Sequence, residues 1–445
     1  MRFLSTRASR GSPGSSFRSA LFDGLAPDGG LFVPERIDPW SEEQLRDLPS
    51  RSLAEIGAQT LAPFVREEIG ADRLVQIVED ALTFQIPLVE VEPGVYALEL
   101  FHGPTLAFKD VGARVMARFM AALHEGGEPL TVLAATSGDT GGAVAHAFHA
   151  VPHTRVVILY PWGRVSPTQE AQLTMFNAEP GTNVRAYAVA GSFDDCQRLT
   201  KEAFGDRDLR RRVRLSSANS INIGRLLPQM LYYAHAIAQL QRVTGVAPSP
   251  LIVSTPSGNF GNLTAGLMQK RAGLPIARFV AATNANDIVP SYLQTGRFEP
   301  RASVHTIANA MDVGNPSNFD RIMWLYEADA DAVRRDITGS RHLDDEVKTT
   351  IRRVYHERGY LLDPHSAIAY LGLVGGLGRV GQVGRDGRIG IFLATAHPAK
   401  FAEVVEPMIG QVIPKPAPLV EALSATRRVM RVQATIDDMR EAISR

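Results

Sequence analysis

Only six of the 445 residues are lysines, so chemistry that needs a primary amine has few candidates. One of them, Lys109, follows the apolar residues 106–108 and opens a stretch with helical apolar spacing. An ammonium group on an apolar wall beside the positive end of a helix has a lowered pKa, which makes a nucleophilic amine. The alternative is a surface lysine whose stem covers apolar side chains. The unusual context at 103–110, Gly-Pro-Thr-Leu-Ala-Phe-Lys-Asp, favours the chemical role.

Two glycine-containing turns each join an apolar strand to a helix. Residues 257–262, Ser-Gly-Asn-Phe-Gly-Asn, leave backbone amides bare at Gly258 and Gly261, and the helix start adds about half a positive charge. This loop matches neither the Walker A pattern nor the three-glycine dinucleotide pattern, and a tight turn without a ligand is an equal alternative. Residues 137–142 echo the loop and add the hydroxyls of Ser137 and Thr140. Two anion cradles suit ligands that bear a phosphate and a carboxylate.

Polar side chains gather at two further places. Residues 217–225 bring Ser220, Asn222 and Arg225 to the start of an apolar helix, where hydroxyl, amide and guanidinium groups can clamp a phosphate or carboxylate. A helix cap made by Asn or Ser, with Arg225 paired to an acid, is the alternative. The strand-like run 389–393 leads to Thr395, whose hydroxyl would lie at the carboxyl end of a strand, where ligands of α/β sheets bind.

The elements that must position these groups are readable from hydrophobic periodicity. Residues 1–93 form an α-rich unit, closed by an extended segment at 86–93. Helices are predicted at 42–48, 53–65, 71–82, 141–149, 226–240 and 263–272, and strands at 130–134, 155–160, 251–254, 277–281 and 389–393. Strands separated by helices pair in parallel and are covered on both faces. The sequence therefore predicts two doubly wound α/β domains, 94–230 and 231–445, after a small N-terminal domain at 1–93, with exchange of segments between the two α/β domains allowed.

Composition excludes several other classes of protein. Lys plus Arg and Asp plus Glu both number 47, so no overall basic field exists to hold nucleic acid or an anionic membrane. No apolar run approaches the roughly 20 residues of a membrane span, and no paired His, Cys or Asp spacing indicates a metal site. The single cysteine, Cys196, suits a reducing compartment, so the cytoplasm is predicted. The Arg- and Ser-rich first 22 residues are interpreted as a folded N-terminus, with a transit peptide as the alternative.

Taken together, the motifs resemble the threonine synthase family, pyridoxal phosphate enzymes of the tryptophan-synthase-β-like fold (fold type II). The likeness runs through nearly the whole chain, and the N-terminal segment is similar to that of the longer microbial and fungal branch. The matching segments are 5–7, 24–34, 102–110, 136–142, 220–225, 257–262 and 395–401. The lysine motif and the loop at 257–262 are each fairly specific, and their occurrence in this order is strongly so.

The resemblance implies pyridoxal 5'-phosphate as cofactor, held by Lys109 as a Schiff base, with Lys109 then acting as acid and base at the substrate carbons. The implied cofactor-binding residues are Lys109, Phe108, Asp139, Gly258, Asn259, Phe260, Gly261, Asn262 and Thr395. The implied substrate-binding residues are Ser137, Gly138, Thr140, Ser220, Asn222 and Arg225. The implied reaction converts O-phospho-L-homoserine and water to L-threonine and phosphate, in a monomer or homodimer that has no nucleic acid or membrane partner.

Asp139 is the least expected member of that set. A carboxylate beside an anionic ligand repels it unless the carboxyl group is protonated or turned away, and dehydratases on the same scaffold carry Asn at this position. A serine/threonine dehydratase or a phospho-amino-acid lyase is the nearest alternative function, although a dehydratase has no need of a γ-phosphate clamp at Arg225. A protein that binds pyridoxal phosphate or a phospho-ligand without turnover, and a nucleotide-binding Rossmann module, are more distant alternatives.

Overall fold

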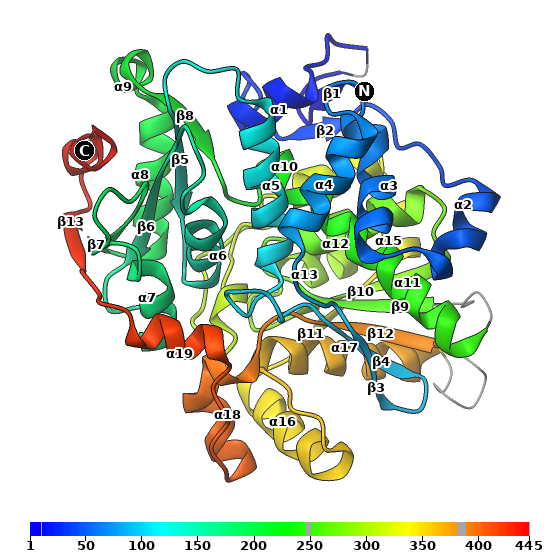
Figure 1. The fold of residues 1–445 in the computed structure, drawn as a ribbon. Helices are drawn as coiled ribbons and strands as arrows, with labels where there is room; N and C mark the ends of the chain where they lie inside the picture. Colours follow the sequence, from blue (N-terminus) through cyan, green and yellow to red (C-terminus); the bar gives the residue numbers. More distant parts are fainter. Residues whose placement is uncertain (10, 246–250, 381–388, 445) are drawn as a thin grey trace.

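Two largely parallel β-sheets organise the chain (Figure 1). The computed structural model describes residues 1–9, 11–245, 251–380 and 389–444. The larger sheet has the order β11 (Ile337–Arg341), β10 (Ile276–Thr283), β9 (Leu251–Pro256), β12 (Ile389–Ala394), β4 (Val95–Glu99) and β3 (Leu88–Glu92). All its neighbours are parallel except β3, which pairs antiparallel with β4. The smaller sheet is parallel throughout, in the order β13 (Met430–Gln433), β7 (Val184–Ala190), β6 (Thr154–Pro161), β5 (Leu130–Ala135) and β8 (Arg214–Ser217).

Helices cover both faces of each sheet, as alternation along the strands requires. In β10, Phe279 and Ala281 belong to one apolar cluster, whereas Val280 and Ala282 belong to another that includes Ile368 of α17. The helices that follow the N-terminal part are α5 (Lys109–Leu123), α6 (Asp139–Phe148), α7 (Pro167–Thr174), α8 (Phe193–Gly205), α9 (Arg207–Arg212), α10 (Ile223–Leu226), α11 (Met230–Thr244), α12 (Gly261–Arg271), α13 (Ile288–Thr295), α14 (Phe319–Leu325), α15 (Ala330–Asp336), α16 (Asp344–Arg358), α17 (Pro364–Val380), α18 (Ala402–Ile409), α19 (Ala417–Ser424) and α20 (Ile436–Ser444). Short 3₁₀ turns lie at Leu48–Ser50, Leu227–Gln229, Asn309–Met311 and Pro398–Phe401. The predicted α/β class is confirmed.

The N-terminal part is α-rich and folded, as predicted. It contains α1 (Phe17–Asp23), α2 (Glu42–Asp47), α3 (Leu53–Val65) and α4 (Ala71–Ala81), together with a small antiparallel pair, β1 (Phe3–Ser5) and β2 (Phe32–Pro34). Ser41 and Ser52 make capping boxes at the starts of α2 and α3, which explains why both helices begin where the periodicity places them.

Segments do pass between the two sheets. The hairpin of β3 and β4 lies in the larger sheet, so the boundary drawn at residues 93 and 94 falls inside one β-hairpin. From the opposite end of the chain, β13 joins the smaller sheet beside β7. Local periodicity identifies a strand but not its partner, which is why the sequence-based boundaries cut through these pairs.

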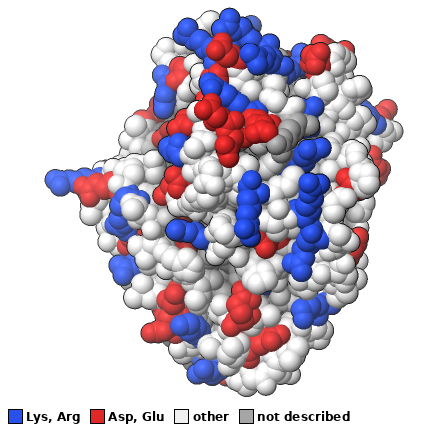
Figure 2. Space-filling model, turned by 90° about the vertical axis from the view of Figure 1, so that its left-hand side faces the viewer, with Lys and Arg blue, Asp and Glu red and all other residues white. Residues whose placement is uncertain are grey.

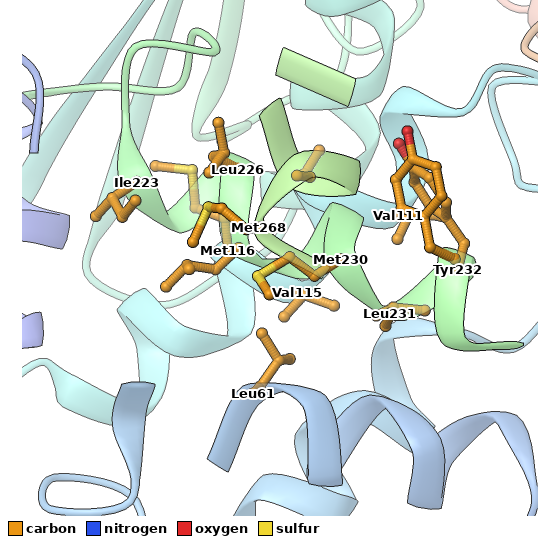
Figure 3. Close-up of a cluster of buried hydrophobic side chains, with 14 of the residues drawn as sticks. Leu61, Val111, Val115, Met116, Ile223, Leu226, Met230, Leu231, Tyr232 and Met268 are labelled. Carbon is orange, nitrogen blue, oxygen red and sulfur yellow. The ribbon is translucent and has the colours of Figure 1, made fainter. Parts of the chain in front are cut away.

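One apolar core ties the N-terminal part to the α/β body (Figure 3). Leu61 of α3 lies against a cluster that includes Val115 and Met116 of α5, Ile223 of α10 and Met230 of α11, and these side chains are almost fully buried. The paired Tyr232 and Tyr233 of α11 are core residues as well. Since the N-terminal part shares this core, it packs against the α/β body and has no independent hydrophobic centre.

Truncation of that core should be costly. Leu61→Ala leaves a cavity among residues of α3, α5 and α11, and we expect it to lower the free energy of unfolding by about 2–5 kcal/mol. Urea unfolding of purified protein measures this change. Val412→Ala removes methyl groups from a side chain that is 75% exposed and should change the free energy by no more than about 0.5 kcal/mol. Equal losses in both variants would contradict the shared core.

The face built around α8, α9 and α20 carries charges of both signs side by side (Figure 2). Neighbouring side chains there form ion pairs, such as Arg211 with Asp208 and Arg440 with Asp206. Across the described ranges, no helix is long and apolar enough to cross a membrane.

Candidate active site

A cavity opens between the two sheets, and the elements around it are the ones that carry the sequence motifs. Its lining comes from the start of α5, the β5–α6 turn, the segment before α10, the β9–α12 loop and the residues after β12. The predicted site residues that line it are Phe108, Lys109, Ser137, Asp139, Thr140, Ser220, Arg225, Gly258, Asn259, Phe260, Gly261, Asn262 and Thr395. Chain segments nearly 300 residues apart are thus brought to one place, at the carboxyl ends of parallel strands.

Two predicted residues do not line this cavity. Asn222 caps α10, accepting from the Gly224 N–H at 2.8 Å and donating to the carbonyls of Leu21 and Ser217. The structure therefore shows Asn222 holding the chain through its amide, and the contact with substrate stays a prediction. Gly138 has φ +136°, and a Cβ there would lie 2.4 Å from the carboxamide carbon of Gln169, so its glycine serves a turn and a close approach.

Lys109 is the first residue of α5, and its side chain is 15% exposed to the cavity. Its Nζ lies 4.0 Å from Oδ2 of Asp139. Burial lowers the pKa of Lys109 to about 8; Asp139 opposes this shift, while the nearby positive charges of Lys400 and Arg225 reinforce it. This shift has the direction that the sequence predicts, and a pKa of about 8 leaves a sizeable fraction of Lys109 neutral near pH 8.

Asp139, at the start of α6, has a partner that the sequence analysis did not assign. The ammonium of Lys400, which is completely buried, lies 2.8 Å from Oδ1 of Asp139 and also donates to the Thr105 carbonyl at 2.8 Å. Burial alone would raise the pKa of Asp139, but Lys400 and then Lys109 outweigh it and hold that pKa well below its ordinary value. Asp139 is thus neither protonated nor unpaired, and the expected repulsion of an anionic ligand is offset by a buried cation.

Arg225 is a buried guanidinium that pairs with no acid in the described part of the chain. Its Nη1 donates to the Ala218 carbonyl at 2.6 Å, while Nε has no hydrogen-bond partner. Burial lowers the pKa of Arg225 to about 10, with a small opposing contribution from Asp110. Within the described residues no carboxylate forms an ion pair with it, so the alternative of an acid-paired Arg225 is excluded there. An uncompensated buried cation that faces a cavity is a site for an anion.

The loop between β9 and α12 presents its backbone to the same cavity. No acceptor in the described part of the chain takes the backbone N–H groups of residues 258–262. The side chains instead stiffen the loop: Asn259 donates to Ser220 Oγ at 2.6 Å, and Asn262 donates to the Pro256 carbonyl at 2.9 Å. Phe260 adopts a left-handed backbone with φ +60°, which turns the chain into the helix. Free amides at a helix start form a phosphate cradle.

A methyl group should disrupt this cradle. At Gly258 a Cβ would lie 2.9 Å from the Met311 Cα, a backbone atom, so Gly258→Ala must displace either the loop or its neighbour. We expect at least about a tenfold loss of affinity for a phosphate-bearing cofactor, since backbone hydrogen bonds to charged groups contribute about 1.5–3 kcal/mol each. Equilibrium dialysis measures the affinity. Gly205→Ala, where a Cβ meets nothing within 4 Å, is the control and should bind normally.

Comparison with known proteins settles the family. Residues 82–394 match the family model described as "Pyridoxal-phosphate dependent enzyme", residues 2–82 match "Threonine synthase N terminus", and residues 379–443 match "Threonine synthase, C-terminal". The threonine synthase of Haemophilus influenzae is 46% identical over 407 residues, which are 91% of this chain and 91% of that protein. The chain belongs to the threonine synthase family.

Solved structures of threonine synthases agree with this membership. The crystal structure of threonine synthase from Escherichia coli superimposes with a TM-score of 0.90 and 40% identity, covering 100% of this chain and 99% of that one. The PLP-bound threonine synthase from Brucella melitensis also gives a TM-score of 0.90, at 36% identity, covering 100% and 98%. The fold type II architecture and the pyridoxal phosphate dependence expected from the sequence are confirmed for this member of the threonine synthase family.

The residues of the cavity fit that cofactor. The unengaged amides of 258–262 suit its phosphate, and space at Gly258 is kept free of a Cβ. The neutral amine of Lys109 suits the aldehyde of the cofactor. The backbone carbonyl of Thr395 accepts from the Phe108 N–H at 2.8 Å, so Thr395 lies next to the residue that precedes Lys109. The phosphate of the cofactor would occupy the amides of residues 258–262. The guanidinium of Arg225 is then available for a second anion.

Several cavity residues escaped the sequence analysis. The motifs did not mark Phe193, Gln197, Gln229 or His365, because each sits in an ordinary helical context. Lys400 was among the six lysines and inside the matching segment 395–401, so the scarcity of lysine was a signal that could have identified it.

Proposed function

We propose that this threonine synthase family member converts O-phospho-L-homoserine and water to L-threonine and phosphate. The observation that carries the proposal is a second anion site beside the first. Asn259 of the 258–262 cradle donates to Ser220 Oγ, and Ser220 stands in the same segment as the unpaired guanidinium of Arg225. A phosphorylated cofactor and a phosphorylated substrate together require two such sites, whereas a dehydratase substrate supplies no second phosphate.

Each residue role follows from placement and charge. Arg225 and Ser220 would hold the substrate phosphate, and Arg225 would stabilise it as it leaves, because a buried cation interacts strongly with a dianion. The α6 start at Ser137 and Thr140 would receive the substrate carboxylate through backbone amides and hydroxyls. These two clamps fix the substrate at both ends and leave its reacting carbons in front of Lys109.

Lys109 would take and return the protons. Its pKa of about 8 lets Nζ exist as amine and as ammonium at working pH, which a base that must later act as an acid requires. The bound cofactor supplies the electron sink that stabilises negative charge at the substrate carbons. The Thr395 hydroxyl would face the pyridine nitrogen of the cofactor, and Phe108 would lie alongside it.

The deciding experiment follows phosphate and threonine released from O-phospho-L-homoserine by the cofactor-loaded protein. Equal amounts of both products support the proposal. Phosphate accompanied by a keto acid in place of threonine would convert the assignment to a lyase, and absence of both products would reject the substrate. L-Serine and L-threonine are included as substrates, because ammonia and a keto acid from either would indicate a dehydratase.

We also propose that this small-molecule enzyme works in the cytoplasm. The single cysteine, Cys196, can form no disulfide within the chain, which suits a reducing compartment, and burial raises the pKa of its thiol to about 12. We propose a monomer or a homodimer, which light scattering of purified protein distinguishes.

A further inference from the structure

Lys400 has no place in the roles assigned so far, although it is completely buried one side chain away from the reactive amine. It lies after β12, in the 3₁₀ turn Pro398–Phe401, and reaches back to two segments more than 250 residues earlier. Its ammonium contacts Oδ1 of Asp139 at 2.8 Å, and the Nζ of Lys109 approaches the other carboxylate oxygen, Oδ2, at 4.0 Å. One carboxylate is therefore shared by two lysines, with Lys400 holding it much more closely.

We propose that Lys400 is a positioning residue: it holds Asp139 as a carboxylate directed toward itself and so leaves the amine of Lys109 free to lose its proton. This inference rests on the proposed role of Lys109. A buried carboxylate must have a cation, because an unpaired buried charge costs several kcal/mol. If Lys400 did not supply that cation, Lys109 would be the nearest substitute, and a lysine bound as a counter-ion is a poor nucleophile and base.

The charges around Lys109 and Asp139 support separate roles for the two lysines. The charged groups that act on Lys109 are Asp139, Lys400, Arg225 and Asp110, and the imidazole of His365 also lies near Asp139. His365 is itself fixed by Asp363, at 2.7 Å from Nδ1, and its Nε2 accepts from the Ala310 N–H. Among these groups, Lys400 makes the short contact to Asp139, so its removal changes the partner of that carboxylate most.

The second contact of Lys400 provides a way to separate this role from a purely structural one. The Thr105 carbonyl accepts from Lys400, but it also accepts from Nε2 of Gln172 at 3.2 Å. Loss of Lys400 therefore leaves the Thr105 carbonyl paired and Asp139 without its close cation. A structural role through Thr105 would be insensitive to the residue at 139, whereas the proposed role depends on it entirely.

The test measures the titration of Lys109 in the full-length chain without cofactor, as the pH dependence of its acetylation by acetic anhydride, read by mass spectrometry of the peptide. This readout is independent of threonine formation, so it can fail while the proposed function stands. In the Lys400→Met variant, Lys109 should keep its proton up to a higher pH, because loss of that proton would leave the buried carboxylate of Asp139 without a cation. We expect the midpoint to rise from about 8 by roughly one unit or more, and the reactive fraction at pH 7 to fall about tenfold.

Two further variants make the test decisive. Asp139→Asn removes the carboxylate that raises the pKa of Lys109, so the midpoint should fall below that of the native chain. The double variant Asp139→Asn/Lys400→Met should titrate well below Lys400→Met alone. If Lys400→Met does not fold, Asp139→Asn still tests the premise that Asp139 raises the pKa of Lys109. An unchanged midpoint in either single variant, or equal midpoints in Lys400→Met and the double variant, would overturn the proposal.

Lys270→Met is the matched control. Lys270 also combines an aspartate, Asp336 at 3.5 Å, with two backbone carbonyls, those of Ile276 and Ala277, but it lies away from the cavity. Its loss should leave the titration of Lys109 unchanged. With cofactor loaded, the pH midpoint of the visible absorption band is a second readout, and it should move in Lys400→Met and stay in place in Lys270→Met.

Discussion

Lys109→Ala should abolish turnover, with kcat reduced about 10⁴-fold or more. The variant removes a covalent anchor and the group that moves protons at the substrate carbons, and general acid–base catalysis alone contributes about 10²–10⁴-fold. Borohydride treatment should attach the cofactor to the peptide that contains residue 109 in the native protein and to no peptide in the variant. Steady-state phosphate release and mass spectrometry measure the two effects.

The pH dependence of cofactor attachment tests the role of Lys109 more specifically. Because burial lowers the pKa of Lys109 to about 8, the neutral fraction, and with it the rate of cofactor attachment, should rise about tenfold per pH unit below 8 and level off above it. Lys348→Ala, which removes a half-exposed lysine paired with Asp345 on α16, should leave turnover and attachment unchanged. A plateau that begins only near pH 10.5 would show that Lys109 has an ordinary amine pKa and would contradict its assigned role.

Arg225→Met should lower kcat/KM for O-phospho-L-homoserine about a hundredfold or more while leaving the protein at least as stable as before. The activity loss follows from removing charge-assisted hydrogen bonds to the phosphate, at about 1.5–3 kcal/mol each. The stability expectation follows from the unpartnered Nε and from the lack of an acidic partner among the described residues, since replacing an uncompensated buried charge by an apolar side chain removes a desolvation cost. Initial rates and thermal unfolding of the cofactor-free chain provide the two measurements.

Arg211→Met controls for the loss of a guanidinium. Arg211 is exposed and pairs with Asp208 on the molecular surface, so its removal should affect neither quantity. If Arg225→Met instead lost stability and activity together, the guanidinium would be a structural residue whose Ala218 contact holds the segment, and the phosphate would need another clamp.

The features that were predicted correctly from the sequence are those that depend on residues close together in the chain. The helix at 53–65 and the strand at 251–254 appear in α3 and β9 almost as predicted, because capping boxes, apolar periodicity and turn residues act over a few positions. Lys109 at a helix start and a glycine loop before α12 are also local features. The family resemblance then placed most of these residues in one cavity.

What the sequence could not specify depends on contacts between distant segments. Asn219 and Asn222 have the same chemistry three positions apart, yet only Asn219 lines the cavity, while Asn222 is turned toward Leu21. The ionised state of Asp139 depends on Lys400, which is 261 positions later in the chain and becomes its neighbour only when β12 takes its place. Pairing in the sheet, rather than any local pattern, decides both.

The interleaved sheets also set the order in which the protein can be completed during synthesis. β4 emerges early, but both β4 and β9 pair with β12, and that strand is not made until residues 389–394. Until then each presents an unpaired edge, and edges of this kind associate with other chains. The smaller sheet has its central strands by residue 190 and its β8 edge by residue 217, yet β13 closes its other edge only at residues 430–433. A chain released after β9 is made but before residue 389 therefore has three strands that still lack a neighbour, β4, β9 and β7, and each is an edge that a chaperone would have to shield.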